Sequence, residues 1–170
     1  MAGTKVFQIA GYQNSGKTTL IENMILEGKS RRLTIGTIKH HGHGGAPAVP
    51  KLEKDTDKHR DAGADAVCVY GEETMVMEVH KRDWTPHQLI RFFQGLGLDF
   101  VFLEGFKKEA FPKVVLIRSP QDEVLLKQLS EIRAVLAWIP VNNEYSFPIY
   151  KVEETDRFIR DFYSGIFLPE

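Results

Sequence analysis

The chain has 170 residues, of which 42% are hydrophobic and 26% are charged, and this composition is typical of one soluble globular domain. Its formal net charge of -1 excludes a strongly basic surface, so we expect no nucleic acid partner and no attraction to an anionic membrane. One cysteine, and the lack of any apolar run near the ~20 residues of a bilayer span, predict a cytoplasmic protein without disulfides or membrane segments.

Short apolar runs alternate with segments of helical periodicity along the chain. The apolar runs predict strands at Val6–Ala10, Leu33–Lys39, Ala66–Tyr70, Thr74–His80, Phe100–Leu103, Val114–Ile117 and Ala134–Ile139. The turn Gly71-Glu72-Glu73 joins the third and fourth of these strands as a hairpin. Helical periodicity predicts helices at Thr18–Leu26, at Glu123–Leu129, at Glu153–Phe167 and from Pro86 to about Gly95. Because strands alternate with helices, we expect a parallel sheet covered on both faces.

Two of the predicted helices have an apolar face that we expect to pack on the sheet. In the helix that begins at Pro86, this face comprises Leu89, Phe92, Phe93 and Leu96. In the last helix, it comprises Phe158, Ile159, Phe162 and Ile166. Cys68 lies inside an apolar run, so we expect it in the core, and we expect Trp84 and Trp138 to be packing residues.

Residues 11–18 read Gly-Tyr-Gln-Asn-Ser-Gly-Lys-Thr and match the pattern G-x-x-x-x-G-K-[ST] of a phosphate-binding loop. Glycines let the backbone curl so that its N–H groups point at phosphate oxygens, and the helix that follows adds its positive N-terminal end. Lys17 supplies a charge for the β- and γ-phosphates, and the Thr18 hydroxyl is a Mg²⁺ ligand. The predicted phosphate-binding residues are Gly11, Asn14, Ser15, Gly16, Lys17, Thr18 and Thr19.

The motif and the alternating elements together predict a fold class. We expect an α/β, three-layer P-loop NTPase fold with a mostly parallel central sheet and a β-hairpin extension. We expect residues 1–170 to form a single nucleotide-binding domain, because no long linker or composition shift divides them.

Glu104 is a carboxylate at the end of the predicted strand Phe100–Leu103. In P-loop proteins a carboxylate at such a position stands beside the phosphate loop and holds Mg²⁺, usually through water. We therefore predict a Mg²⁺ site made by Glu104 and Thr18. Many P-loop enzymes have Asp here, so the exact role of the Glu is open, and a solvated strand end is the alternative.

Four segments give the chain a resemblance to a known family. They are the phosphate loop, Thr37–His41, the Lys-Asp-Thr…Arg-Asp-Ala-Gly-Ala pattern at 54–64, and Leu103–Lys107 followed by Phe111-Pro112-Lys113. Each resembles a segment of the MobB family, and together they cover most of residues 5–118. The resemblance implies a GTP-binding accessory protein, often a homodimer, with slow Mg²⁺-dependent GTP hydrolysis at most. It also implies a partner, a MobA-like molybdopterin guanylyltransferase, which joins GMP to the molybdopterin cofactor.

The resemblance also implies roles for charged residues outside the phosphate loop. By this likeness Glu104 serves Mg²⁺ or the attacking water, and Asp55 is a second catalytic carboxylate. Lys39, Arg60 and Lys107 are expected to line the cleft and to neutralise phosphate charge, including that of a pterin phosphate. The family often has acidic residues after its Ile-Lys-His segment, whereas this chain reads Gly-His-Gly-Gly-Ala-Pro at 42–47.

The residues that read the base are not defined by the sequence. The chain has no Asn-Lys-x-Asp, the usual guanine reader of regulatory GTPases, so a preference for guanine over adenine is not visible. Asn142 and Asn143 follow the predicted strand Ala134–Ile139, where related folds place the base, and an Asn side chain can pair with a guanine edge. A solvated turn is an equal alternative.

Three other functions fit the sequence at this stage. A small-molecule kinase would use the same phosphate loop, although the late arginines are single rather than clustered in a lid. A metal-delivery GTPase would use His40, His41 and His43, although a built site would add a fixed fourth ligand. A pure binding adaptor, whose nucleotide state only switches a partner surface, fits as well as a weak GTPase.

Overall fold

The computed structural model describes residues 3–41, 54–142 and 144–167 of the chain. The chain divides into two compact units: residues 1–40 with 86–170 form the first, and residues 41–85 form the second. The two units are described separately below. None of the helices in the described ranges is long and apolar enough to cross a membrane.

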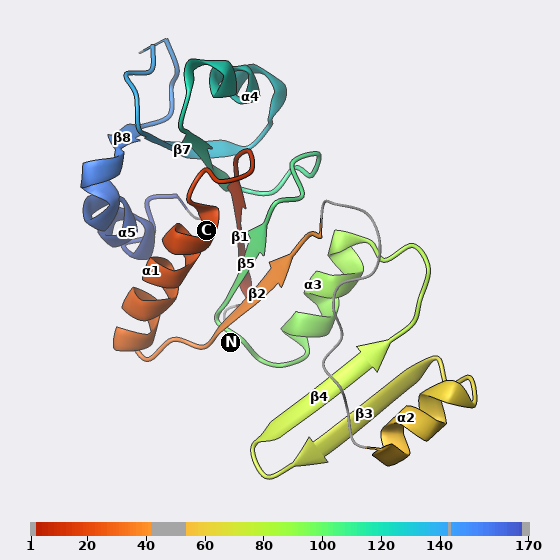
Figure 1. Ribbon diagram of the computed structural model, residues 1–170. Coiled ribbons are helices and arrows are strands. Elements are labelled where there is room, and N and C mark those ends of the chain that lie inside the picture. The colour runs from red at the N-terminus through yellow and green to blue at the C-terminus, as the bar shows by residue number, and fades with distance from the viewer. Residues whose placement is uncertain (1–2, 42–53, 143, 168–170) are drawn as a thin grey trace. The chain divides into compact units, whose positions relative to one another are not determined.

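The first unit, called the sheet unit, contains six strands and most of the helices (Figure 1). Its strands are β1 (Lys5–Ala10), β2 (Ile35–Lys39), β5 (Phe100–Glu104), β6 (Lys113–Ile117), β7 (Ile132–Ala137) and β8 (Ile149–Lys151). Its α-helices are α1 (Lys17–Ser30), α3 (Pro86–Gln94), α4 (Val124–Gln128) and α5 (Thr155–Tyr163). Short 3-10 turns at Pro120–Glu123 and Val152–Glu154 precede α4 and α5.

The six strands form one sheet in the order β2-β5-β1-β6-β7-β8, and every neighbouring pair is parallel. The alternating side chains of β1 illustrate how both faces are covered. Phe7 and Ile9 join the core under α1 and α5, whereas Ala10 joins the core under α4. Helix α3 packs on the same side as α4, where Ile90 meets Val101. The three-layer α/β fold with a mostly parallel sheet, predicted from the sequence, is confirmed.

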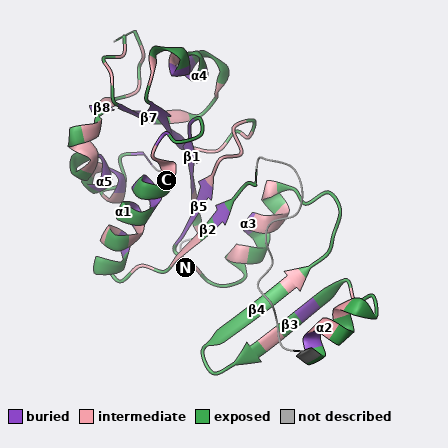
Figure 2. Ribbon diagram, in the orientation of Figure 1, coloured by how far each residue is buried: buried purple, intermediate pink, exposed green. Residues whose placement is uncertain are grey.

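Aromatic side chains dominate the core between the sheet and α1 and α5. Phe162 of α5 lies against Phe7 with ring centroids 4.8 Å apart, and it also contacts Phe100 and Phe102. All four residues are almost completely buried. Figure 2 shows the buried residues concentrated in the strands of the sheet. This core fixes the strand ends at which the candidate site lies.

The second unit, called the hairpin unit, contains α2 (Lys54–Asp61), β3 (Ala66–Gly71) and β4 (Thr74–Val79). The strands pair antiparallel across a turn at Glu72 and Glu73, and Glu72 has the positive φ of 49° that such a turn requires. The predicted hairpin is therefore confirmed. Arg60 of α2 donates to Glu78 of β4 at 2.8 Å, and this hydrogen bond ties the helix to the hairpin. Arg60 also donates to Asp57 of its own helix.

One side of the hairpin is apolar and exposed, and it is called the open face. The register places its residues directly opposite one another across the two strands as Ala66 with Val79, Cys68 with Met77, and Tyr70 with Met75. All six are exposed, Tyr70 to 76% and Met75 to 46%. The expectation that Cys68 belongs to the core is wrong, because its strand belongs to a two-stranded hairpin rather than to the central sheet.

Two further expectations about packing are corrected in part by the structure, and one strand was missed. Helix α5 ends at Tyr163, so the helical periodicity stops there: Ile166 is 65% exposed and the next residue, Phe167, is buried. In α3 the predicted residues Leu89 and Phe93 pack against the core beside the buried Ile90, whereas Phe92 and Leu96 are exposed. Strand β8 was not predicted, because its three residues are too few to show a pattern.

Candidate functional site

The phosphate loop connects β1 to α1 in the sheet unit, as its motif predicts. Its backbone turns through two left-handed residues, Asn14 with φ of 60° and Gly16 with φ of 86°. Gly11 is needed for close packing, since a Cβ atom there would lie 2.5 Å from Ser15 Oγ and 3.3 Å from the carbonyl oxygen of Leu116. The tight curl places the first N–H groups of α1 around one concave loop, which is the geometry of an anion cradle.

The Lys17 ammonium lies over this loop. Its Nζ donates to the carbonyl oxygen of Tyr12 at 2.6 Å and to Ser15 Oγ at 3.5 Å. Burial lowers the pKa of Lys17, the charges of Lys107 and Lys39 lower it further, and the carboxylate of Glu104 opposes them. The charged form of Lys17 is thus less favourable here than in water. An anion bound in the loop would stabilise this charge, and the attraction would in turn favour binding of the anion.

Glu104 ends β5 next to the loop, as predicted, and its side chain is only 12% exposed. The Thr18 hydroxyl lies 3.3 Å from Glu104 Oε1, and the Lys39 ammonium at the end of β2 lies 3.0 Å from the same oxygen. Carboxylate and hydroxyl oxygens are ligands that Mg²⁺ accepts, and it usually completes its shell with phosphate oxygens and water. Within the described ranges no group of three or more His, Cys, Asp or Glu side chains gathers to hold a metal.

The turn after Glu104 is held by Gln8, a residue that our reading of the sequence did not select. Gln8 is fully buried in β1, and its Nε2 donates to the carbonyl oxygens of Gly105 at 2.6 Å and Phe106 at 2.8 Å. The backbone N–H of Gly105 in turn donates to Ile9. The signal was present, since Gln8 is the one polar residue in the apolar run Val6–Ala10.

Two more contacts of the loop were also missed. Arg118, directly after β6, donates a guanidinium hydrogen to the carbonyl oxygen of Asn14. Trp138, directly after β7, lies against Gly16 and is 38% exposed, so it is a packing residue with an open side. The sequence places both at strand ends, but only the register of the sheet brings them to the loop.

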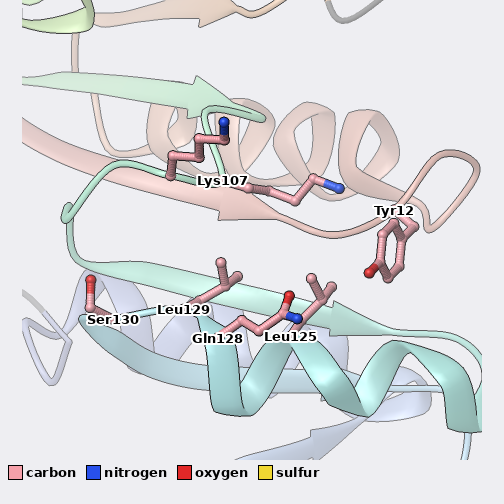
Figure 3. Close-up of a pocket in the computed structure, with 7 residues that line it drawn as sticks. Tyr12, Lys107, Leu125, Gln128, Leu129 and Ser130 are labelled. Atoms are coloured by element: carbon pink, nitrogen blue, oxygen red, sulfur yellow. The ribbon is translucent and has the colours of Figure 1, made fainter.

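A cleft of about 310 Å³ opens beside the loop, between the turn after β5 and helix α4 (Figure 3). Lys107 Nζ lies 4.1 Å from the centre of the Tyr12 ring, a cation–π contact at one side of the cleft. The cleft is lined by Tyr12, Lys107, Lys108, Leu125, Gln128, Leu129 and Ser130. Lysine and leucine side chains thus line the same cleft, which combines positive charge with apolar surface.

The remaining predicted site residues are placed as follows. Asp55 and Arg60 belong to the hairpin unit, where Asp55 pairs with Lys58 at 2.7 Å and Arg60 pairs with two carboxylates. Asn142 is exposed and donates to Glu144 Oε1 at 2.5 Å. Asn143 and His43 lie outside the described residues. The structure therefore brings together the phosphate loop, Glu104, Lys39 and Lys107.

A parallel sheet with helices on both faces, and a glycine-rich loop between β1 and α1, places the chain in the P-loop NTPase fold class. The family model of molybdopterin guanine dinucleotide synthesis protein B, or MobB, matches residues 6–138. The chain belongs to this family.

Curated relatives and solved structures agree with the family. A probable molybdopterin-guanine dinucleotide biosynthesis adapter protein of Bacillus subtilis is 38% identical over 76% of this chain and 75% of the relative. The corresponding adapter protein of Haemophilus influenzae is 33% identical over 79% of this chain and 72% of the relative. The crystal structure of Bacillus subtilis MobB is similar with a TM-score of 0.79 and 32% identity, covering 98% of this chain and 99% of that one. A MobB homologue from Bacillus stearothermophilus gives a TM-score of 0.77, 31% identity and coverage of 95% and 97%.

Proposed function

We propose that this chain is a GTP-binding adapter that assists the conversion of molybdopterin cofactor to its guanine dinucleotide form, with slow Mg²⁺-dependent GTP hydrolysis. The observation that carries the proposal is the phosphate loop with Lys17 above it and the Thr18–Glu104 pair beside it. The proposal is supported by the names of the curated relatives, which are described as adapter proteins of molybdopterin-guanine dinucleotide biosynthesis.

In this proposal the residues of the loop divide the work by charge. The backbone N–H groups of Gly11–Thr19 and the ammonium of Lys17 bind the phosphates, which replace the carbonyl of Tyr12 as the partner of Lys17. Thr18 and Glu104 hold Mg²⁺, which supplies charge neutralisation for the β- and γ-phosphates. Glu104 also forms an ion pair with Lys39. It is therefore better suited to hold a cation than to take a proton from water, and we expect hydrolysis to be slow. Asp55 is the second proposed catalytic carboxylate.

A second ligand, the molybdopterin cofactor, is proposed to bind beside the nucleotide. Lys107 supports this assignment, because it stands at the cleft next to Tyr12. Lys39 supports it too, because its side chain is 63% exposed beside Glu104. Arg60 is proposed for the same role, although Asp57 and Glu78 already neutralise its charge. The proposed macromolecular partner is a MobA-like guanylyltransferase, which would receive or deliver the cofactor.

We propose in addition that the chain forms a homodimer through the open face of the hairpin. Apolar residues fill this face, and an exposed apolar sheet face of this kind is typical of a protein interface. A two-stranded hairpin is also marginally stable by itself, and a second copy would cover it.

The test is a calorimetric titration of the purified protein with Mg–GTP and with Mg–ATP. We expect the protein to bind GTP more tightly than ATP, and the variant Lys17→Ala to lower the GTP affinity on the order of 100-fold or more. Lys29→Ala, at the opposite end of α1, is the matched control and should leave the affinity unchanged. Equal affinity for both nucleotides would refute the guanine assignment, and an unaffected Lys17→Ala variant would refute the phosphate site.

A further inference from the structure

The phosphate loop is contacted from one side by two side chains that stand opposite the proposed magnesium site. Strand β5, which ends in Glu104, neighbours β1 on one side, and β6 and β7 follow on the other. From that other side Arg118 reaches the carbonyl oxygen of Asn14, and Trp138 lies against Gly16. The two sides of the loop therefore present different chemistry, oxygen ligands on one and a cation with an aromatic ring on the other.

Trp138 is fixed against the loop and yet open to solvent. A Cβ atom on Gly16 would lie 3.0 Å from Cη2 and 3.2 Å from Cζ2 of the indole, so the ring packs directly on the backbone of the loop. The backbone N–H of Trp138 donates to the carbonyl oxygen of Ile117 at 2.9 Å, which anchors the residue to the end of β6. Nevertheless 38% of its surface is exposed, a large fraction for a tryptophan that is held on two sides.

The direction of a bound nucleotide follows from this asymmetry. Thr18 and Glu104 mark the end of the loop where the β- and γ-phosphates and Mg²⁺ would lie. The α-phosphate, the ribose and the base must then extend away from Glu104, toward β6 and β7 and along the carboxyl edge of the sheet, where ligands bind in open α/β folds. Tyr12 and Trp138 are both exposed aromatic side chains at the loop, but the Lys107 ammonium lies over the ring of Tyr12, whereas Trp138 lies against Gly16 at the end of β7.

We propose that the indole of Trp138 stacks against the purine of the bound nucleoside triphosphate. This role rests on the nucleotide-binding function proposed above, and it adds the residue that holds the base. Stacking supplies affinity for any purine, because every base has an aromatic face, and it does not read the edge that distinguishes guanine from adenine. It therefore explains how a chain without an Asn-Lys-x-Asp motif retains a base site.

The test separates the base from the phosphates by comparing Mg–GTP with inorganic tripolyphosphate. In the variant Trp138→Leu, which keeps an apolar contact with Gly16 but loses the ring, we expect GTP affinity to fall about tenfold or more. The affinity for tripolyphosphate should stay within about twofold, because the loop itself is unchanged, and ATP affinity should fall by a similar factor to GTP. Trp138→Phe should restore most of the GTP affinity.

A second measurement uses Trp138 as its own reporter. The chain has two tryptophans, so Trp84→Phe leaves Trp138 as the only one. We expect GTP to change the emission of this variant at saturation and tripolyphosphate to change it much less. A parallel loss of GTP and tripolyphosphate affinity in Trp138→Leu would show a structural role instead, and an unchanged GTP affinity would overturn the stacking role. If the wild-type protein binds neither GTP nor tripolyphosphate, the phosphate site and the stacking role are both refuted. If it binds tripolyphosphate and Trp138→Leu leaves the GTP affinity unchanged, only the stacking role is refuted.

Discussion

The strands of the sheet unit and those of the hairpin unit bury their side chains to very different extents. In β6 every residue is buried, whereas in β4 every residue except Glu78 is exposed. Both strands are mostly apolar, so the difference comes from what packs on them: helices cover both faces of the sheet, and α2 covers one side of the hairpin. The comparison teaches that the sheet is stabilised by helices of its own unit. The open face of the hairpin, by contrast, is an apolar surface that a partner would stabilise by covering it.

The largest expected effect concerns the aromatic core of the sheet unit. Phe162→Ala removes a ring that contacts Phe7, Phe100 and Phe102, and we expect it to lower the free energy of unfolding by ~3–5 kcal/mol. Phe92→Ala on α3 is the control, since this phenylalanine is 43% exposed, and it should cost less than ~1 kcal/mol. Denaturant unfolding of both variants measures the difference. Similar losses would mean that the buried and exposed rings contribute alike and would contradict the comparison.

A second effect concerns a charge inside the sheet. Lys113 begins β6 fully buried, donates to the carbonyl oxygens of Glu109 at 3.0 Å and of Ser130, and has its pKa lowered by burial to about 8. The unfolded chain keeps this proton up to the ordinary lysine value of 10.5, so stability rises with pH between about 8 and 10.5. Compared with Lys113→Met, the wild-type protein should therefore gain on the order of 2 kcal/mol between pH 8 and pH 10.

Thermal or denaturant unfolding at several pH values measures this gain for the wild type and the variant. The comparison with Lys113→Met removes the contribution of every other titrating group, because both proteins contain those groups. Lys127→Met on the exposed side of α4 is the control: it keeps Lys113, so its free energy of unfolding should differ from that of the wild type by an amount that does not change with pH. A constant difference between the wild type and Lys113→Met over this range would contradict the assignment of the proton.

The smallest effect on folding, and the sharpest test of the comparison, lies on the open face. Met77→Thr keeps a strand-forming residue at a position that is 41% exposed, so we expect the free energy of unfolding at low concentration to change by less than ~1 kcal/mol. The same variant should weaken the proposed homodimer, which sedimentation velocity measures as a shift toward the monomer. Leu26→Thr on α1, where leucine is 69% exposed, is the matched control. A dimer that survives Met77→Thr but not Leu26→Thr would move the interface to the sheet unit.

The sequence was sufficient wherever structure is determined by neighbouring residues. The strand Val6–Ala10, the motif at 11–18 and the helix that follows form one local unit, and Pro86 correctly marked the start of α3. Glu104 was found because it ends an apolar run. By contrast, Arg118 and Trp138 reach the loop from strands more than a hundred residues further along the chain, through a strand order that periodicity does not encode. The exposure of Cys68 was misjudged for the same reason, since an apolar strand looks alike in a covered sheet and in a hairpin.

Glu104 has one further consequence, for the end of β2. It pairs with Lys39, and its backbone oxygen accepts the N–H of His40, the last residue before the chain leaves for the hairpin unit. A divalent ion at the proposed site and the Lys39 ammonium would therefore compete for the same oxygen. Because such coupling is reciprocal, a metal bound at the proposed site would weaken the ion pair with Lys39, and loss of that pair would make Glu104 a better ligand. The affinity of the proposed site for a metal and the position of the Lys39 side chain at the end of β2 would thus share one thermodynamic balance.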